Sequence, residues 1–218
     1  MKDSIRSLIM HHRTAWDDYF PGTSPTTPLS PNEYNERNAL SGTYVYVSNC
    51  LFSRCTSSSD GGALNCNSVT YLLVESSSFF SCKTSSSSGG AIYFCNANSG
   101  ECVFHKICGN DCSAGSSNSQ FVYTCVKNLA SSKNYVNYSS IIRCVTENSG
   151  THFILRLDYG KIYCPSVNIS MNKCVYYSGI SCVPFTDSSS ITCSFLYTSF
   201  TDNTAIGSVC IHLNCGAL

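Results

Sequence analysis

A short sequence pattern occurs twice between Phe52 and Cys95, and it constrains the fold more than any other feature of the chain. The first copy is Phe52-Ser53-Arg54-Cys55, followed by a serine-rich loop and Gly61-Gly62-Ala63-Leu64. The second copy is Phe79-Phe80-Ser81-Cys82, followed by another serine-rich loop and Gly89-Gly90-Ala91-Ile92. A tandem pattern with a period of about 30 residues is typical of architectures in which each repeat stacks on its neighbours.

Weaker copies of the pattern follow downstream. The residue that closes the Phe-x-x-Cys half recurs at a similar period, at Cys55, Cys82, Cys112, Cys144, Cys174 and Asn203. An apolar residue stands three positions earlier in most copies, at Phe52, Phe79, Ile141, Met171 and Phe200. Gly109 occupies this position in the third copy. After a loop of small residues we expect a strand to begin at Ala63, Ala91, Phe121, Phe153 and Ile180.

The segments between these motifs predict strands and no helices. From Thr43 onward, short runs of β-branched and aromatic residues alternate with Ser, Gly and Asn clusters, which is typical of an all-β domain. Such a repeat cannot bury its apolar side chains alone, but stacked copies can pair equivalent strands in parallel, at about 4.8 Å per step. Parallel strands joined by crossovers are right-handed. The sequence therefore predicts a right-handed parallel β-helix of about six coils with a short N-terminal helix.

The motif residues also predict corners. Side chains alternate along a strand, so Phe52 and Cys55 can both face inward only if the chain bends between them. The glycine pairs 61–62 and 89–90 are expected to supply positive φ at a second corner.

The core face of the following strand is less clear, because two apolar sets compete for it. One set is Ala63, Ala91, Phe121 and Phe153, and the other is Leu64, Ile92, Val122 and Ile154. The polar residues Arg156 and Thr124 share the alternation of the second set, and they therefore favour the first set as core.

Three segments are predicted along the chain. Residues 1–20 form a short amphipathic helix that could cap an open end of the coils, with one apolar face at Ile5, Leu8, Ile9, Trp16, Tyr19 and Phe20. Residues 21–41 form a proline-rich linker, and residues 42–218 form the β-helix. Because the chain stops soon after a motif copy, a truncated β-helix is one expectation.

Charge and hydropathy argue against two classes of partner. The 13 basic and 13 acidic residues are spread without runs, so there is no electrostatic footprint for nucleic acid. No stretch approaches the roughly 18 consecutive apolar residues that a membrane helix needs. Charged residues near the start also interrupt any secretory signal. We expect no nucleic-acid partner and no membrane span in this chain.

At the motif residues the chain resembles known repeat families. Phe-x-x-Asn combined with Gly-Gly-Ala-Ile/Leu resembles the repeat of the polymorphic outer-membrane proteins of chlamydiae, and the cysteine version resembles cysteine-rich surface proteins of parasitic protists such as trichomonads. The resemblance covers roughly residues 42–215, with full motifs at residues 52–64 and 79–92 and a half-motif at 200–203. It implies a parallel β-helix at a cell surface or outside the cell, with an adhesive role and an unknown protein or glycan ligand.

Residues that could carry chemistry are few. Asp158 and Asp187 lie nearly one coil apart and are the best pair for glycoside hydrolysis, which needs two carboxylates about 5 to 9.5 Å apart. No third acid, arginine or histidine aligns with them. Cys102, His105, Cys108 and Cys112 are of metal-ligand type, but their spacing lacks a Cys-x-x-Cys pair. We therefore predict no catalytic, cofactor-binding or metal-binding residues.

The 16 cysteines usually suggest an oxidising compartment. Equivalent corner positions in adjacent coils would lie within disulfide range, but their parallel Cβ directions strain the bond. A ladder of buried thiols is therefore favoured over a ladder of disulfides, at Cys55, Cys82, Cys112, Cys144 and Cys174. Other pairs could still bridge, such as Cys50 with Cys66 or Cys210 with Cys215. Asn137-Tyr138-Ser139 and Asn168-Ile169-Ser170 match the N-glycosylation motif of secreted proteins.

Three hypotheses of function follow. The leading one is a non-enzymatic surface or secreted module for adhesion or ligand interaction. The alternative is a carbohydrate-active lyase or hydrolase that uses Asp158 and Asp187. The third is a fragment of a longer structural solenoid that has no activity of its own.

Overall fold

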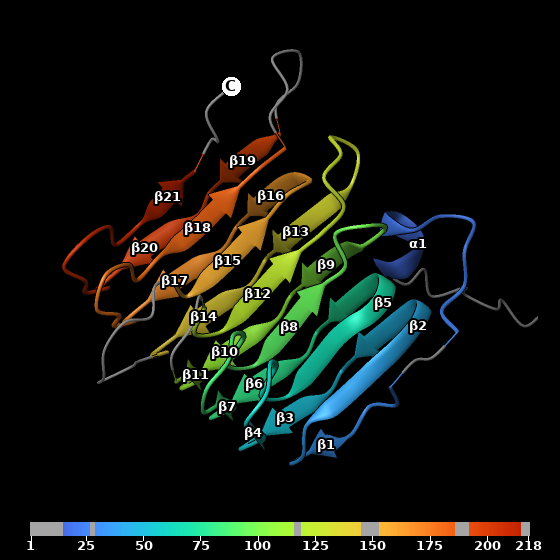
Figure 1. Ribbon diagram of the computed structural model, residues 1–218, viewed down its shortest axis with the longest axis horizontal. Coiled ribbons are helices and arrows are strands. Elements are labelled where there is room, and N and C mark those ends of the chain that lie inside the picture. The colour runs from blue at the N-terminus through green and yellow to red at the C-terminus, as the bar shows by residue number, and fades with distance from the viewer. Residues whose placement is uncertain (1–14, 27–28, 116–118, 145–152, 186–191, 215–218) are drawn as a thin grey trace, which may run out of the picture.

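The computed structural model of the protein describes residues 15–26, 29–115, 119–144, 153–185 and 192–214. It is a parallel β-helix of about five turns, in which successive coils lie side by side from the blue N-terminal end to the red C-terminal end of Figure 1. All the strand pairs are parallel. The predicted all-β class and parallel β-helix are confirmed.

Each coil contributes to three faces. Face 1 is a seven-stranded sheet made of β1 (Glu33–Tyr34), β3 (Leu51–Ser53), β6 (Ser78–Phe80), β10 (Cys108–Asn110), β14 (Ser140–Ile142), β17 (Asn168–Ser170) and β20 (Ser199–Thr201). Face 2 contains β8 (Ile92–Cys95), β12 (Val122–Cys125), β15 (Leu155–Asp158), β18 (Ile180–Val183) and β21 (Ile211–Leu213). Face 3 contains β9 (Glu101–His105), β13 (Lys133–Asn137), β16 (Lys161–Pro165) and β19 (Cys193–Leu196).

Two long strands join faces 2 and 3 into one sheet. These strands are β2 (Asn38–Ser48) and β5 (Leu64–Glu75). The first part of β5 pairs with β8 and its second part pairs with β9. A small sheet of β4 (Thr56–Ser57), β7 (Lys83–Thr84) and β11 (Ser113–Ala114) lies between faces 1 and 2 in chain order.

The two full motif copies stack in register. Phe52 pairs with Phe79, and their rings lie parallel with centroids 4.8 Å apart. Thr56 pairs with Lys83 directly after the motif, so Cys55 lies beside Cys82. Both cysteines are buried in the core. The expectation that these residues are stacked neighbours is confirmed.

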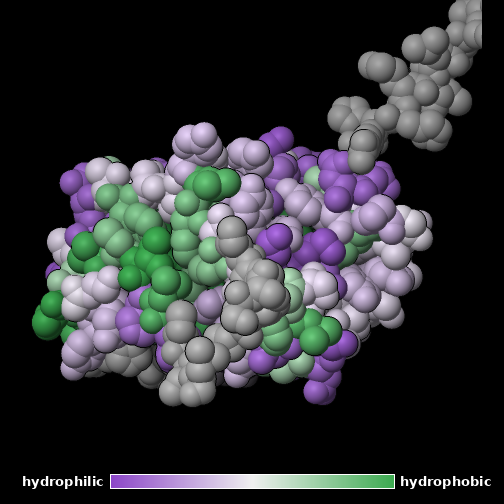
Figure 2. All heavy atoms as spheres, turned by 90° about the horizontal axis from the view of Figure 1, so that it is seen from above, coloured by the Kyte–Doolittle hydropathy of each residue, from purple (hydrophilic) through white to green (hydrophobic). Residues whose placement is uncertain are grey.

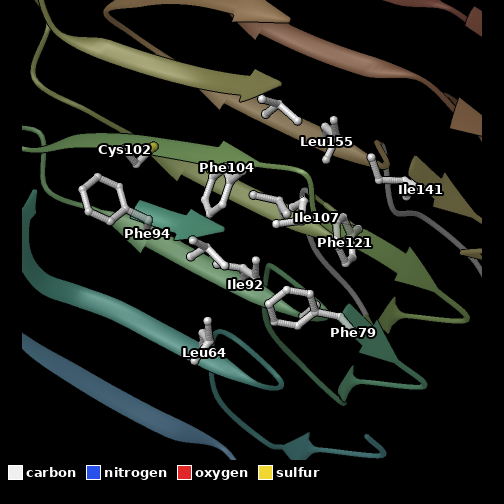
Figure 3. Packing of buried hydrophobic residues seen from close by; sticks show 14 of the residues in the cluster. Leu64, Phe79, Ile92, Phe94, Cys102, Phe104, Ile107, Phe121, Ile141 and Leu155 are labelled. Atoms are coloured by element: carbon white, nitrogen blue, oxygen red, sulfur yellow. The ribbon is translucent and has the colours of Figure 1, made fainter. Parts of the chain in front are cut away.

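The third copy compensates for its missing apolar side chain. Gly109 pairs with Phe79 on one side and with Ile141 on the other. The ring of Phe121 fills the space beside Gly109, because a Cβ added at this glycine would lie 2.5 Å from that ring. Figure 3 shows Phe121 in the core between Phe79 and Ile141.

Left-handed residues form the corner on each side of the face 1 strands from β3 to β20. The predicted bend between Phe52 and Cys55 is confirmed, because Arg54 has φ 57°. The same conformation recurs in the later coils, at Ser81, Asp111, Arg143, Met171 and Asp202. A second set precedes the face 1 strands, at Asn49, Ser76, Lys106, Tyr138, Ser166 and Tyr197.

The two glycines of each pair have different roles. Gly61 and Gly89 have φ of 73° and 68°, as predicted. The second glycines are needed for close packing instead, since a Cβ on Gly62 would lie 2.1 Å from the carbonyl oxygen of Gly90. The prediction of positive φ therefore holds for the first glycine of each pair only.

The fifth motif copy is shifted relative to the prediction. Ile169 pairs with Ile141 and with Phe200, so Ile169 and not Met171 occupies the apolar position. The residue that closes this copy is consequently Asn172, not Cys174. The prediction was wrong because Met171 and Cys174 are also an apolar residue and a cysteine three positions apart, so they imitate the motif by chance.

The core face of the face 2 strands was also predicted wrongly. Leu64, Ile92 and Val122 lie in one inward row, which continues at Leu155 and not at Ile154. The other set, Ala63, Ala91, Phe121 and Phe153, lies at the corner before the strand and is also buried. Thr124 misled the argument because it faces the core, where its hydroxyl donates to Asn134 Oδ1 at 2.8 Å.

The β-helix begins before residue 42. Strand β1 lies in the predicted linker and pairs with β3, and Tyr34 stacks on Phe52 with ring centroids 5.2 Å apart. Residues 26 and 29 donate backbone hydrogen bonds to Tyr44 and Tyr46 of β2. The segment that was predicted as a linker thus covers the first coil. Most of the predicted N-terminal helix lies outside the described residues, and α1 covers Ala15–Tyr19.

Candidate functional site

Helix α1 packs on the outer surface of face 3 and does not cap an end of the coils (Figure 1). Trp16 and Phe20 are buried against Leu73 of β5 and Val103 of β9. Leu73 and Val103 point outward because they alternate with core residues of the same strands. The Trp16 indole N–H donates to the carbonyl oxygen of Thr23, which fixes the chain after the helix.

A hollow of about 190 Å³ lies beside this helix. It is lined by Tyr19, Phe20, Pro21, Thr23, Tyr44, Tyr71, Glu101 and Lys133. Strand register places the residues of face 3 together, because Tyr44 pairs with Tyr71 and Tyr71 pairs with Glu101. Lys133 is on the next strand and forms an ion pair with Glu101 at 3.0 Å.

The walls of the hollow are mainly aromatic. Tyr44 and Tyr71 are stacked with centroids 5.2 Å apart, and Phe20 meets Tyr71 edge-on at 5.5 Å. The Lys133 ammonium lies 5.3 Å from the centroid of the Phe20 ring. The paired Glu101 and Lys133 add one carboxylate and one ammonium without adding net charge. The hollow thus offers flat apolar faces and two polar groups.

A polar network anchors the C-terminal end of α1. The Tyr19 hydroxyl lies 3.0 Å from His105 Nδ1 and accepts a hydrogen bond from Asn137 Nδ2 at 2.7 Å. Burial lowers the pKa of His105, which favours a neutral ring that accepts the Tyr19 proton. Next to it, Tyr46 donates to the Glu75 carboxylate. Burial, together with this carboxylate, raises the pKa of Tyr46 to about 12.

Only one of the two acids of the enzyme hypothesis lies among the described residues. Asp158 is 5% exposed. Its carboxylate accepts hydrogen bonds from Arg156 Nε at 3.1 Å and from the Tyr123 hydroxyl at 3.1 Å. Asp187 lies outside the described residues.

The four metal-type residues of the third coil are also dispersed. Cys102 and Cys112 are buried in the core, Cys108 is exposed on face 1, and His105 contacts Tyr19 on face 3. Among the described residues, no group of three or more histidine, cysteine or acidic side chains could hold a metal ion.

The corner cysteines form a ladder of free thiols. All the described cysteines are free, so Cys50 and Cys66 are not bridged as had been considered, and Cys215 lies outside the described residues. The thiols of Cys82 and Cys112 donate to the carbonyl oxygens of Phe52 and Phe79 in the preceding coil. The neighbouring thiol in the next coil is the largest cause that raises the pKa of Cys55 and of Cys82, and burial is the largest cause at Cys112. The ladder consists of Cys55, Cys82, Cys112 and Cys144.

Asparagines continue this ladder in the last two coils. Asn172 Oδ1 accepts a hydrogen bond from the Cys144 backbone N–H at 2.8 Å. Asn203 Oδ1 accepts from the Asn172 backbone N–H at 3.0 Å. Cys174 is buried but lies two residues beyond this position.

The two glycosylation motifs differ in access. Asn137 is 2% exposed and its side chain bonds to Tyr19, so the folded protein cannot present it to a glycosyltransferase. Asn168 is half-buried on face 1 and accepts a hydrogen bond from Ser199.

Sequence reasoning missed the hollow, although part of its signal was available. Tyr44 and Tyr71 lie in the short runs of β-branched and aromatic residues that predict strands after Thr43, and their outward direction follows from alternation with Val45 and Leu72. Glu101 and Lys133 were not singled out, because nothing local places them on adjacent strands. The contribution of Phe20 depends on the docking of α1, which the sequence did not specify.

Fold and surface together define a parallel β-helix with an aromatic hollow on one side. No protein-family model, curated protein or solved structure gives a significant match to this chain. In the part of the chain that the structure describes, no helix has the length and apolar character to cross a membrane.

Proposed function

We propose that this protein is a non-enzymatic interaction module, at a cell surface or secreted, that binds a glycan in the hollow beside α1. The observation that carries the proposal is the set of aromatic side chains gathered there around one ion pair. Ligand sites in proteins are concave and mostly apolar, with a few polar groups that fix orientation.

The chemistry of the hollow favours a sugar over a charged ligand. Tyr44 and Tyr71 offer ring faces to an apolar surface, and tyrosine hydroxyls can also form hydrogen bonds. The Glu101 carboxylate can accept from a hydroxyl group and the Lys133 ammonium can donate to one. Their mutual pairing leaves no net charge to attract an anion or a cation. At about 190 Å³ the hollow suits one ring of a longer glycan.

The surroundings of Asp158 support a binding role over a catalytic one. Its carboxylate is buried and already engaged by Arg156 and Tyr123. A catalytic acid or nucleophile must instead reach a bound substrate.

Binding of the intact protein to a glycan array, followed by calorimetry with the best glycan, tests the proposal. Tyr71→Ala removes one stacking face and is expected to weaken binding at least about tenfold. Tyr123→Ala is the matched control, because Tyr93 and Tyr123 stack on face 2 with the same 5.2 Å centroid separation. Circular dichroism checks that both variants fold. The proposal fails if no glycan binds, or if Tyr71→Ala and Tyr123→Ala have equal affinity.

A further inference from the structure

Among the described residues, nothing pairs with the outer edge of the last coil, which leaves this end of the β-helix open. Strands β20, β19 and β21 are the terminal strands of their sheets, and each pairs with a strand of the preceding coil only. Unpaired backbone groups on such edges are ready to pair with another strand.

Apolar side chains of the core also reach this end. Phe200 and Ile211 are half-buried, whereas their partners in the preceding coil, Ile169 and Ile180, are fully buried. Leu213 and Ile206 are 53% and 82% exposed. Figure 2 shows hydrophobic surface concentrated toward the left of the view, the end that carries the last coil, while the opposite end is mainly hydrophilic.

This surface is also hollowed. A cavity of about 290 Å³ is lined by Lys173, Cys174, Val175, Thr204, Ala205 and Ile206. The asparagine ladder also leads to this end, since the backbone N–H groups of Cys144 and Asn172 each donate to the asparagine side chain of the next coil. The same bond at Asn203 requires an acceptor from outside the described chain.

The two ends of the β-helix differ in two respects. At the N-terminal end, Val45 and Val47 are fully buried beneath the chain's own residues, including Leu29. At the C-terminal end, Asp202 is the single acidic or basic residue, apart from histidine, in residues 192–214. Exposed edges normally carry lysines or other charges that prevent pairing. Residues 192–214 contain no lysine, and Lys173, which lines the cavity at this end, belongs to the preceding coil.

We propose that the open end binds a second copy of this chain, in a tail-to-tail dimer. Head-to-tail stacking would need the N-terminal edge, which Thr26, Leu29 and β1 already cover. A two-fold axis perpendicular to the helix axis places the same edge on both partners and closes the assembly. That operation reverses the strand direction, so the facing edge strands pair antiparallel. The apolar residues at both edges then share one core.

Light scattering coupled to size-exclusion chromatography tests this dimer. We expect the protein to be dimeric and Ile206→Asp with Leu213→Asp to make it monomeric, because each aspartate would be buried without a partner. Leu129→Asp is the matched control: Leu129 is 41% exposed in the turn between β12 and β13, far from either end, and its variant should remain dimeric.

Hydrogen exchange identifies the surface that is buried. The amides of β20 and β21 should become more protected as protein concentration rises, and those of β1 should not. A monomeric parent protein, a dimer that survives the paired aspartates, or open-ended fibres would each overturn the proposal.

Discussion

Cys55, Cys82, Cys112 and Cys144 occupy one corner position in successive coils, where asparagine takes over at Asn172 and Asn203. Both residue types are small and can bond to the coil above or below. Asparagine makes the stronger contacts, because the Asn172 side chain accepts a hydrogen bond from the Cys144 backbone N–H and donates one to the Ile141 carbonyl oxygen of the preceding coil. Cysteine fills the same space as a small apolar residue with a weak donor. The position therefore selects for size first and for hydrogen bonding second.

These buried thiols should make the free energy of unfolding decrease at alkaline pH. The pKa values of Cys82 and Cys112 are raised in the fold, above the usual value of about 8.5. Above that pH the unfolded chain loses these protons while the folded protein keeps them, so the free energy of unfolding falls as pH rises. The stability is fully present below about pH 8.5 and declines by up to about 1.4 kcal/mol per pH unit for each such thiol.

Urea unfolding at several pH values between about 8 and about 10 measures this slope. Cys112→Ala should reduce the slope of the free energy of unfolding against pH by the contribution of one thiol. Cys108→Ala changes an exposed cysteine on face 1 and is the control. If Cys112→Ala and the parent protein have equal slopes, the corner thiols do not carry the effect.

At the scale of elements, the face 1 strands could be predicted but their corners only in part. The apolar residue of the motif located four of these strands directly, at Phe52, Phe79, Ile141 and Phe200. The left-handed residues beside them carried no signal, because Arg54, Lys106, Tyr138 and others have no common side chain. Stacking between coils imposes their conformation, and a single sequence does not report that stacking.

Left-handed corners predict an unusual response to glycine. Met171 has φ 56° and is 46% exposed. A residue with a Cβ pays about 1 to 2 kcal/mol in this conformation, and glycine avoids this cost but loses more backbone entropy on folding. We expect Met171→Gly to raise the free energy of unfolding by up to about 1 kcal/mol.

Met171→Val is the contrasting variant, since a β-branched residue tolerates this conformation poorly. It should lower the free energy of unfolding in the same urea titration. A loss of stability in Met171→Gly would mean that the Met171 side chain, not the corner, determines stability here.

Docking of α1 on face 3 should weaken at acid pH. The pKa of His105 is lowered by burial and by Lys106, against the smaller opposing effects of Glu75 and Asp18. A lowered histidine pKa means that the unfolded or undocked state binds more protons, so the stabilisation is fully present above about pH 6.5 and is lost as the pH falls through the folded value. Protonated His105 cannot accept the Tyr19 proton, and α1 should detach.

Trp16 reports this change because it is the single tryptophan of the chain and is buried between α1 and the outer surface of face 3. Its fluorescence should shift to the red below about pH 6 as it becomes exposed. His105→Gln should remove the transition, whereas His212→Gln, in the last coil, should retain it. A transition that persists in His105→Gln would assign the effect to another group.

At the scale of the whole molecule, the sequence pattern predicted the architecture because each repeat stacks on the next copy of the same pattern. Phe52 needs only an equivalent phenylalanine one coil away, and Phe79 provides it. The surfaces of the β-helix did not follow in the same way. The hollow joins α1 to strands as far along the chain as β13. The N-terminal end is covered by a segment that the sequence predicted to be a linker.

Because each coil contacts only its neighbours, stability should be graded along the axis. Phe79 is fully buried between Phe52 and Phe121, and Phe79→Ala should cost about 3 to 5 kcal/mol. Phe200 occupies the same motif position in the last coil but is half-buried, so Phe200→Ala should cost less than half as much in dilute protein.

Urea titration at several protein concentrations separates packing within one chain from burial against a second copy. If the open end is buried against a second copy, the cost of Phe200→Ala should grow with concentration while that of Phe79→Ala stays constant. Equal costs at every concentration would contradict the graded stability, because an end coil would then be as well packed as a central one.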